Sequence, residues 1–262
     1  MPNIADYVFT NVSAQLTPLE AFLDPFTHAE LDEIGVAEGW TCFDLGAGGG
    51  SITNVLAERV GSRGRVIAVD QDTHMLTPQP NVEIHTQDMS KDEPLPDGGP
   101  AELIHARLLT HHLPNRRELV HRLAGTLKPG GWLLLGEFVL SEPYVLTAPT
   151  EQDADLFRRV LAALYEVGRR HGVHQEWGNE IHATMLDAGL TSVRTRWHSE
   201  AWTGGEDGSR LLANNVSQKR EQIIETGIAG DAVDHFTDVL MHDPRMVMRS
   251  HLFCSIRGRR PA

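Results

Sequence analysis

A short apolar run followed by a glycine loop, between residues 41 and 51, constrains the fold of this chain more than any other stretch. The run Thr41–Leu45 is typical of a buried strand, and Ser51–Val60 carries apolar residues at helical spacing. Because glycine has no Cβ and adopts positive φ at little cost, the loop lets a ligand approach the backbone closely. Its alternating glycines are Gly46, Gly48 and Gly50. The stretch predicts a strand, a ligand-binding loop and a helix; a tight turn without a ligand is the alternative.

Two residues beside the loop distinguish between classes of ligand. A dinucleotide loop has a third glycine where this chain has Ser51, and the helix that follows it receives a pyrophosphate. Asp44 stands two residues before the first glycine. A carboxylate there repels a pyrophosphate and attracts an ammonium or sulfonium group. The loop therefore favours a ligand that carries positive charge over a dinucleotide.

Between residues 40 and 140 the chain alternates between strand and helix patterns. This alternation predicts an α/β fold: a Rossmann-like, mostly parallel sheet with helices on both faces and ligands at the carboxyl ends of the strands. The predicted strands are Thr41–Leu45, Arg65–Asp70, Val82–Thr86, Ala101–Ala106 and Trp132–Val139. The predicted helices are Ser51–Val60 and Asn115–Leu127, with at most a short one at Thr73–Leu76.

The flanking regions are predicted to elaborate this sheet within one domain that spans residues 1–262. Two capping boxes, starting at Thr17 and Thr27, predict two helices separated near Pro25, which form a helical cover over residues 1–36. Residues 37–140 form the cofactor-binding core, and residues 141–262 carry a helical insertion on the substrate side and the last strands. The later predicted elements are helices at Thr150–Arg170 and Asn179–Ala188, two helices within Ser209–Leu240, and strands at Ser192–Trp202 and Arg245–Arg257.

Composition excludes several classes of partner. The formal net charge of −13 disfavours nucleic acid, and the basic end from Arg257 to Arg260 is too short to change this and is predicted to be a solvated tail. Cys42 and Cys254 each lie in an apolar strand-like run, which predicts buried, reduced thiols and a cytoplasmic location. Residues 1–10 lack the features of a signal peptide, and no run reaches the ~20 apolar residues of a membrane span.

Three motifs resemble those of class I S-adenosylmethionine-dependent methyltransferases of the small-molecule type. They are Asp-x-Gly-x-Gly-x-Gly from Asp44, His-Ala-Arg-x-x-x-His-His-Leu-Pro from His105, and Leu-Lys-Pro-Gly-Gly-x-Leu-Leu-Leu from Leu127. The resemblance runs from about Phe43 to Phe138. It implies S-adenosyl-L-methionine as cofactor, S-adenosyl-L-homocysteine as product, and methylation of a small-molecule acceptor on O, N or C.

The resemblance also implies roles for individual residues. Asp70, which ends the second strand twenty residues after Gly50, binds the ribose hydroxyls, and Asp88 accepts a hydrogen bond from the adenine amino group. Without a ligand, Asp70 would be a turn residue and Asp88 a surface-loop residue. The other implied contacts are Asp44, Gly46, Ala47, Gly48 and Gly50 at the methionine end, Gln71 and Met89 at the adenine, and Arg107 beside the methionine portion.

The acceptor side has candidates but no diagnostic motif. His111 and His112 follow the fourth strand, where one of them could remove a proton from the acceptor, or they could cap a helix or pack. Glu137 ends the fifth strand and either orients substrate or is paired structurally. An aromatic acceptor would suit Tyr144, Trp177, Trp197 and Trp202, although such residues are more often core. A metal at His171, His174 and Glu176 is disfavoured.

Three other functions compete with methyl transfer. A nucleotide-dependent reductase is disfavoured by Asp44, Ser51 and Asp88. A non-catalytic protein could keep the fold as a ligand sensor or subunit, and a protein with this fold could catalyse another reaction with the same cofactor. The acceptor, the methylated atom and the oligomeric state, for which a homodimer is one option, stay open.

Overall fold

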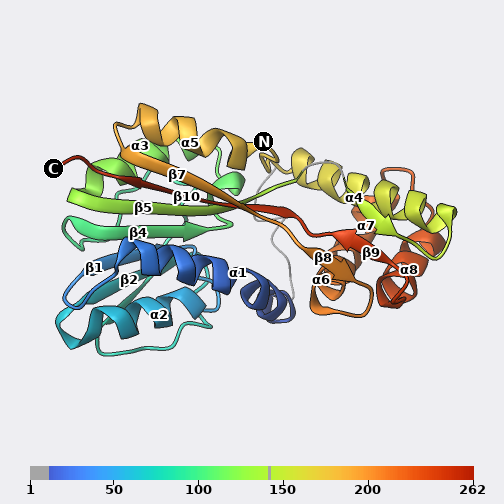
Figure 1. Ribbon diagram of the computed structural model, residues 1–262, viewed down its shortest axis with the longest axis horizontal. Coiled ribbons are helices and arrows are strands. Elements are labelled where there is room, and N and C mark those ends of the chain that lie inside the picture. Colours follow the sequence, from blue (N-terminus) through green and yellow to red (C-terminus); the bar gives the residue numbers. More distant parts are fainter. Residues whose placement is uncertain (1–11, 141–142) are drawn as a thin grey trace. The chain divides into compact units, whose positions relative to one another are not determined.

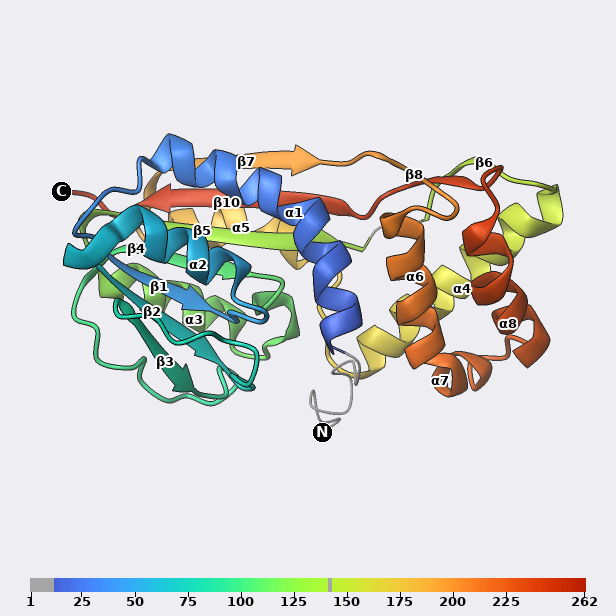
Figure 2. The ribbon, with the colours of Figure 1, turned by 90° about the horizontal axis from the view of Figure 1, so that it is seen from below.

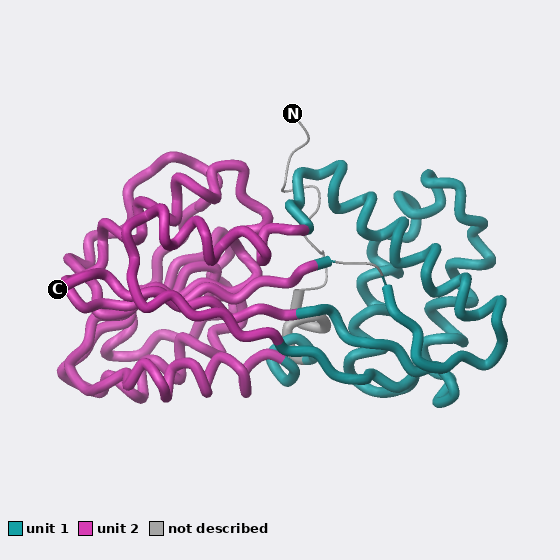
Figure 3. The backbone as a smooth tube through the Cα atoms, turned by 45° about the horizontal axis from the view of Figure 1, so that its top comes forward, with its two compact units in different colours: residues 1–22, 140–175, 198–252 teal, residues 23–139, 176–197, 253–262 magenta. Residues whose placement is uncertain are grey.

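A computed structural model describes residues 12–140 and 143–262, and the chain divides into two compact units. Unit 1 comprises residues 1–22, 140–175 and 198–252, and unit 2 comprises residues 23–139, 176–197 and 253–262 (Figure 3). The predicted insertion after residue 140 is therefore shared between the units rather than forming one block. The assignment of residues 1–262 to one domain stays a prediction.

Unit 2 is built on a seven-stranded sheet, as the alternating pattern predicts. The order is β3-β2-β1-β4-β5-β10-β7, and the pairs among β1 to β5 are parallel. Figure 2 shows β10 pointing opposite to β7. The strands are β1 Thr41–Leu45, β2 Arg65–Asp70, β3 Val82–Thr86, β4 Ala101–Arg107, β5 Leu127–Val139, β7 Thr191–His198 and β10 Leu252–Arg259.

Helices cover both faces of this sheet. Helices α1 and α2 lie on one face, and α3 and α5 lie on the other (Figures 1 and 2). Their bounds are α1 Val12–Ile34, α2 Ser51–Val60, α3 Arg116–Thr126 and α5 Trp177–Asp187, with short 3₁₀ turns η2 at Gly61–Arg63 and η3 at Thr110–His112. The segment Thr73–Leu76 forms no helix. There the Asp72 carboxylate accepts a hydrogen bond from the backbone N–H of His74 at 3.1 Å instead.

The strand order reverses between β1 and β4, because β1 pairs with β2 on one side and with β4 on the other. Leu45, the last residue of β1, is in register with Val69 of β2 and Ala106 of β4. The loops that follow these three strands therefore lie together at the carboxyl ends of the strands. In open α/β sheets this reversal point is where ligands bind.

The two predicted N-terminal helices are one helix, which corrects the sequence prediction. Helix α1 begins before both capping boxes and continues through Pro25 to Ile34. Thr27 is not a cap, because its hydroxyl donates back to the carbonyl of Leu23 at 3.3 Å. Leu23 and Leu31 are fully buried on either side of the proline, and this packing outweighs the lost backbone hydrogen bond. The part of the predicted cover before Val12 lies outside the described residues.

The basic C-terminal end is not wholly a solvated tail, which is a second correction. Arg257 of β10 is buried, and its guanidinium contacts Glu30 of α1 at 2.5 Å and also Glu33. Arg196 of β7 contacts the same two glutamates. A buried arginine needs such partners, so this ion-pair network fastens α1 to the last two strands of the sheet. Both cysteines are buried and free, as predicted, and burial raises the pKa of the Cys254 thiol to about 12.

Unit 1 is a small antiparallel sheet with helices packed around an apolar core. The sheet order is β6-β9-β8, from β6 Val145–Thr147, β9 Val247–Arg249 and β8 Ala201–Thr203. The helices are α4 Glu151–Arg170, α6 Asp207–Gln218, α7 Arg220–Ile224 and α8 Gly230–Asp238, with a 3₁₀ turn η4 at Leu240–His242. Phe157 of α4 stacks on Phe236 of α8 in this core. The prediction of two helices in this region missed one of the three.

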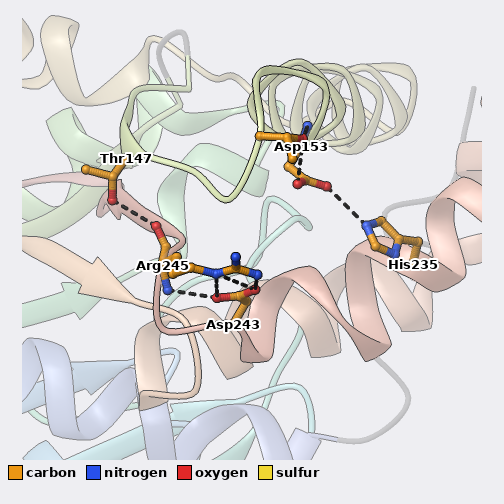
Figure 4. Close-up of polar contacts among 6 residues, drawn as sticks. Thr147, Asp153, His235, Asp243 and Arg245 are labelled. Atoms are coloured by element: carbon orange, nitrogen blue, oxygen red, sulfur yellow. Dashed lines mark hydrogen bonds and ion pairs between the residues drawn. The ribbon is translucent and has the colours of Figure 1, made fainter.

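Polar contacts tie the loops of unit 1 together (Figure 4). The Thr147 hydroxyl donates to the Arg245 carbonyl at 2.9 Å, and the Arg245 side chain pairs with Asp243. Asp153 contacts His235 of α8 at 3.1 Å. Asp153 also donates its N–H to the Thr150 hydroxyl, so Thr150 caps the N-terminus of α4.

The predicted strand over Ser192–Trp202 is interrupted, and so is the one over Arg245–Arg257. The breaks face each other, because Ser250 donates its N–H to the Glu200 carbonyl at 2.8 Å and accepts from the Glu200 N–H at 3.0 Å through its hydroxyl. Each long pattern thus supplies one strand to each unit. Among the described residues, no helix is long and apolar enough to cross a membrane.

Candidate functional site

The glycine loop that follows β1 has the conformation its sequence demands. Gly46, Gly48 and Gly50 have φ of +70°, +55° and +84°, values that residues with a Cβ rarely adopt. Space is also restricted, since a Cβ on Gly46 would lie 3.2 Å from the Cβ of Leu109. The loop closes on itself and on β2: the N–H groups of Gly46 and Ala47 both donate to the Val69 carbonyl. It is therefore a fixed backbone surface at the reversal point of the sheet.

Asp70 lies against this loop, as its spacing predicts. One oxygen of its carboxylate accepts the N–H of Gly48 at 2.8 Å, and the other accepts the N–H of Asp72 at 3.0 Å. Gln71 follows it and is exposed. The end of β3 is held alongside, because Gln87 donates its N–H to the Asp70 carbonyl. A carboxylate with spare lone pairs thus stands beside the loop and can accept further hydroxyl groups.

Asp88 and Met89 come directly after β3. The Asp88 carboxylate accepts both the hydroxyl and the N–H of Ser90, at 2.7 Å and 2.9 Å. The hydrogen bond from the Ser90 hydroxyl is the largest cause that lowers the pKa of Asp88, so the carboxylate is ionised near neutral pH. Met89 is buried. Asp88 is an acceptor, the type of group that an amino group of a base needs.

Asp44 lies beneath the loop rather than on its surface. Its carboxylate is buried, and its two oxygens contact the Thr53 hydroxyl of α2 at 2.6 Å and Nδ1 of His105 on β4 at 2.8 Å. Burial raises the pKa of Asp44, but the hydrogen bonds from His105 and Thr53 and the nearby charges outweigh it, so the net pKa is below the usual value. Asp44 thus joins the loop strand to its helix and its neighbouring strand.

The partners of Asp44, Thr53 and His105, were not among the predicted site residues. The strand register pairs Asp44 directly with His105 across β1 and β4. Asp44 and His105 are 61 positions apart, so their contact can be inferred only once β4 is known to lie beside β1.

Arg107 ends β4 and is held by α1. Its guanidinium forms an ion pair with Asp24 at 2.8 Å and donates to the hydroxyls of Thr27 at 3.1 Å and Ser51 at 3.4 Å. Ser51 in turn donates to Asp24 at 3.2 Å. A guanidinium therefore lies at the first residue of the helix that follows the glycine loop. Asp24 and Thr27 were not among the predicted site residues, because they come from the helix that was predicted only as a cover.

The segment after Arg107 turns sharply into η3. Leu108 has φ of +52°, an uncommon value for a residue with a branched side chain, and its N–H donates to the Gly136 carbonyl of β5 at 2.8 Å. The turn places Leu109 on Gly46 and sends the next three residues into η3. Strain of this kind is concentrated at functional sites.

Glu137 is fully buried on β5 and holds η3. One carboxylate oxygen accepts from the N–H and hydroxyl of Thr110, at 2.6 Å and 2.5 Å, and from the N–H of His111 at 3.2 Å. The other oxygen contacts Nδ1 of His111. The indole N–H of Trp177, the first residue of α5, donates to the Thr110 hydroxyl at 2.8 Å. His112 stacks on His111 with ring centroids 3.9 Å apart.

The other candidates are divided between the two units. Trp177 is buried in unit 2 and Trp202 is buried in unit 1, whereas Trp197 and Tyr144 are exposed. His171 contacts the Val167 carbonyl through Nδ1 at 2.8 Å, at the end of α4. Throughout residues 12–140 and 143–262, no three His, Cys, Asp or Glu side chains gather as metal ligands would.

The chain is similar in sequence to known methyltransferases. The family described as "Methyltransferase domain" matches residues 43–135. Methyltransferase str2 of Strobilurus tenacellus is 26% identical over 132 residues, which are 50% of this chain and 47% of that protein. The chain therefore spans about half the length of the curated relatives it matches.

Two solved structures show the same fold across nearly the whole chain. Phosphoethanolamine N-methyltransferase 2 of Haemonchus contortus, in complex with S-adenosyl-L-methionine, has a TM-score of 0.55 at 16% identity and covers 98% of this chain and 58% of its own. A cyclopropane-fatty-acyl-phospholipid synthase-like protein of Lactobacillus casei has a TM-score of 0.55 at 14% identity and covers 98% and 97%. At these identities the likeness establishes the fold.

Proposed function

We propose that this chain, whose residues 43–135 match a methyltransferase domain, transfers a methyl group from S-adenosyl-L-methionine to a small-molecule acceptor. The observation that carries this proposal is the glycine loop with Asp70 against it, at the reversal point of a sheet of the methyltransferase type. The match to the methyltransferase family covers the strand, loop and helix that build this site.

The residues present suit this cofactor. The three loop glycines leave the backbone exposed where a side chain would stand, so the methionine end can lie close to the loop beside Ala47. Each oxygen of Asp70 accepts one N–H, from Gly48 or Asp72, and keeps a lone pair for a ribose hydroxyl. Arg107 has the charge that the methionine carboxylate requires. Asp44 supports the loop from below.

The adenine end uses the residues that follow β2 and β3. Asp88 accepts from the adenine amino group, the backbone N–H of Met89 faces the ring, and Gln71 contacts its edge. The low pKa of Asp88 keeps it an acceptor over the physiological range. Asp70 would suit the ribose of either ligand, whereas Asp88 after β3 and Ser51 in place of a third glycine disfavour a dinucleotide.

When bound, the cofactor supplies an electrophilic methyl group on a positively charged sulfur. The work of the protein is to hold the acceptor in line with the bond that breaks, and such positioning can be worth ~7–11 kcal/mol. The edge of the sheet beyond the glycine loop carries η3, with His111 and His112, as the candidate groups on the acceptor side. One of these histidines is the proposed base.

Calorimetric titration tests the cofactor assignment. The wild-type chain is titrated with S-adenosyl-L-homocysteine and, separately, with NADH, and the folded Asp70→Ala variant is titrated in the same way. We expect binding of the first ligand alone, and a loss of affinity in Asp70→Ala. Binding of NADH alone would replace the proposal with a reductase. Binding of neither would favour a protein that keeps the fold without this cofactor.

A further inference from the structure

We propose that Glu137 is a positioning residue that sets the tautomer of His111, so that Nε2 of His111 takes the proton of the acceptor. This inference rests on the proposed methyl transfer and deepens it: the attacking atom of the acceptor carries a proton, as in a hydroxyl or an N–H group. An acceptor without such a proton, such as a tertiary amine or a thioether, has no use for this arrangement.

The first step is the charge state of Glu137, which its contacts define. The residue is fully buried, and the backbone and hydroxyl groups that reach its carboxylate are donors. The direction of the Thr110 hydroxyl is also set, because its oxygen accepts from the indole N–H of Trp177 and its hydrogen points to Glu137. A carboxylate that accepts from three donors at one oxygen is stabilised in its ionised form.

The second step is the division of labour between the two oxygens of Glu137. One oxygen alone receives the two N–H groups and the hydroxyl that hold η3 in place. The other oxygen is directed to Nδ1 of His111. An ionised carboxylate can only accept, so Nδ1 carries a hydrogen and the lone pair is on Nε2. Holding the turn does not require this second contact, but fixing the tautomer does.

The third step distinguishes His111 from its neighbour. Burial, and then the nearby charges of His111 and Arg116, lower the pKa of His112 well below its usual value. His112 is thus held neutral against the ring of His111. His111, by contrast, has the Glu137 carboxylate of β5 at its Nδ1, and the ring of His112 is stacked against it. The two histidines are therefore not equivalent, and His111 is the proton acceptor.

The fourth step is the position of His111 near the glycine loop. His111 lies two residues beyond Leu109, whose side chain occupies the space over Gly46 in the glycine loop. The His111 side chain keeps 11% of its surface exposed, whereas the Glu137 side chain keeps 1%. The imidazole can meet a ligand and the carboxylate cannot, so Glu137 acts through His111.

The reaction balances with these groups alone. A lone pair of the acceptor oxygen or nitrogen forms a bond to the methyl carbon, and the carbon–sulfur bond breaks with its electron pair going to sulfur. The proton of the acceptor passes to Nε2 of His111. The imidazolium that results is paired with the Glu137 carboxylate through Nδ1–H. No further reactant is needed.

Nitrogen NMR on ¹⁵N-histidine-labelled protein saturated with S-adenosyl-L-homocysteine tests this inference without an acceptor. His111 is assigned by the signal lost in His111→Asn. In the wild type we expect the proton of the neutral His111 ring on Nδ1 and none on Nε2. A wild-type His111 with its proton on Nε2 would overturn the inference without any variant.

Glu137→Gln provides the second arm. The amide oxygen remains toward the three donors from η3, so the amide NH₂ faces Nδ1 and donates to it. We expect the tautomer to reverse, with the proton on Nε2, while affinity for S-adenosyl-L-homocysteine changes less than twofold. The matched control is Glu118→Gln on the exposed face of α3, in which the tautomer of His111 stays as in the wild type.

An unchanged tautomer in folded Glu137→Gln would overturn the positioning role. Failure of the proposed function looks different: the wild type would not bind S-adenosyl-L-homocysteine, whatever the tautomer of His111. The two measurements are made on the same sample, so each can fail alone.

Discussion

Two buried pairs of a carboxylate and a histidine occur in unit 2, and they differ in what surrounds them. Asp44 on β1 and His105 on β4 face each other in register inside the sheet, with 2% and 3% of their side chains exposed. Glu137 is equally buried, but His111 lies on a turn past the end of β4, with 11% of its side chain exposed. A carboxylate–histidine pair can therefore either be buried within a sheet or leave the imidazole partly exposed. The position of the histidine, within the strand or beyond its end, determines which occurs.

The difference also appears in what each carboxylate holds. Asp44 divides its oxygens between a helix and a strand, through Thr53 and His105. Both carboxylate oxygens of Glu137 contact residues of the same short turn, η3. We therefore expect loss of Asp44 to be felt mainly in stability, and loss of the Glu137 carboxylate mainly in turnover.

The largest effect is expected from Glu137→Gln on the rate of methyl transfer. Reversal of the His111 tautomer removes the lone pair that takes the proton, and general-base catalysis typically contributes ~10²–10⁴-fold. The measurement is the kcat for an acceptor with a hydroxyl or N–H group, with KM and cofactor affinity determined beside it. A fall in cofactor affinity alone, with kcat unchanged, would place Glu137 with Asp44 as a structural residue.

Asp44→Ala is expected to produce the largest loss of stability. His105 and Thr53 both lose a buried acceptor, and breaking a buried pair in this way costs roughly 3–5 kcal/mol. The free energy of unfolding is measured by urea denaturation, and Glu118→Ala on the surface of α3 serves as the control. A loss below that of the surface control would mean that the Asp44–His105 pair contributes little to the fold.

Asp70→Ala should separate binding from stability, because its carboxylate is only partly buried. We expect the affinity for S-adenosyl-L-homocysteine to fall more than tenfold, or by about 1.4 kcal/mol, while the free energy of unfolding changes little. Calorimetry on the folded variant measures the first quantity and urea denaturation the second. Unchanged affinity in a folded variant would remove Asp70 from the cofactor site.

The smallest effect is expected in the pH dependence of stability. The pKa of Asp44 is lower in the folded chain than in the unfolded one, so the unfolded state binds its proton first as the pH falls. The stability from Asp44 is therefore complete above the usual aspartate pKa of about 3.9 and is lost as the pH falls toward the folded value. Wild type should lose more stability than Asp44→Asn as the pH falls below about 4. Equal slopes for the two proteins would contradict the pairing with His105.

Much of unit 2 follows from local sequence signals. Short stretches of sequence are enough to recognise the glycine loop, the acid that ends β2 and the apolar runs of the parallel strands. The structure has these features where the patterns predict them. Positive φ at Gly46 and the carboxylate of Asp70 beside the loop are consequences of short-range rules. These features could be predicted because each depends on few neighbours.

What the sequence did not yield depends on distant partners. Asp44 has the expected position in the loop motif, but its contacts with Thr53 and His105 depend on which strand lies beside β1. The continuity of α1 through Pro25 depends on the burial of Leu23 and Leu31. The ion pair of Glu30 with Arg257 joins residues 227 positions apart, so a helix and a terminal segment that look solvated in sequence are buried together.

Glu137 is the clearest case of this kind. Its position at the end of a strand left two interpretations open, substrate orientation and structural pairing. One oxygen of Glu137 is paired structurally with the turn, and the other contacts His111, the candidate base. Both interpretations therefore describe part of its role. No pattern along the chain could report that Trp177 completes the same cluster from α5.

The most direct test of the central claim is transfer of tritium from methyl-labelled S-adenosyl-L-methionine to a panel of small acceptors that carry hydroxyl or amino groups. Asp70→Ala serves as the matched blank, measured at equal protein concentration. The account predicts that the wild type labels at least one acceptor above the blank, with S-adenosyl-L-homocysteine formed in equal amount. A wild-type protein that binds S-adenosyl-L-homocysteine but labels no acceptor above the blank would contradict it, and would favour a ligand sensor with the methyltransferase fold.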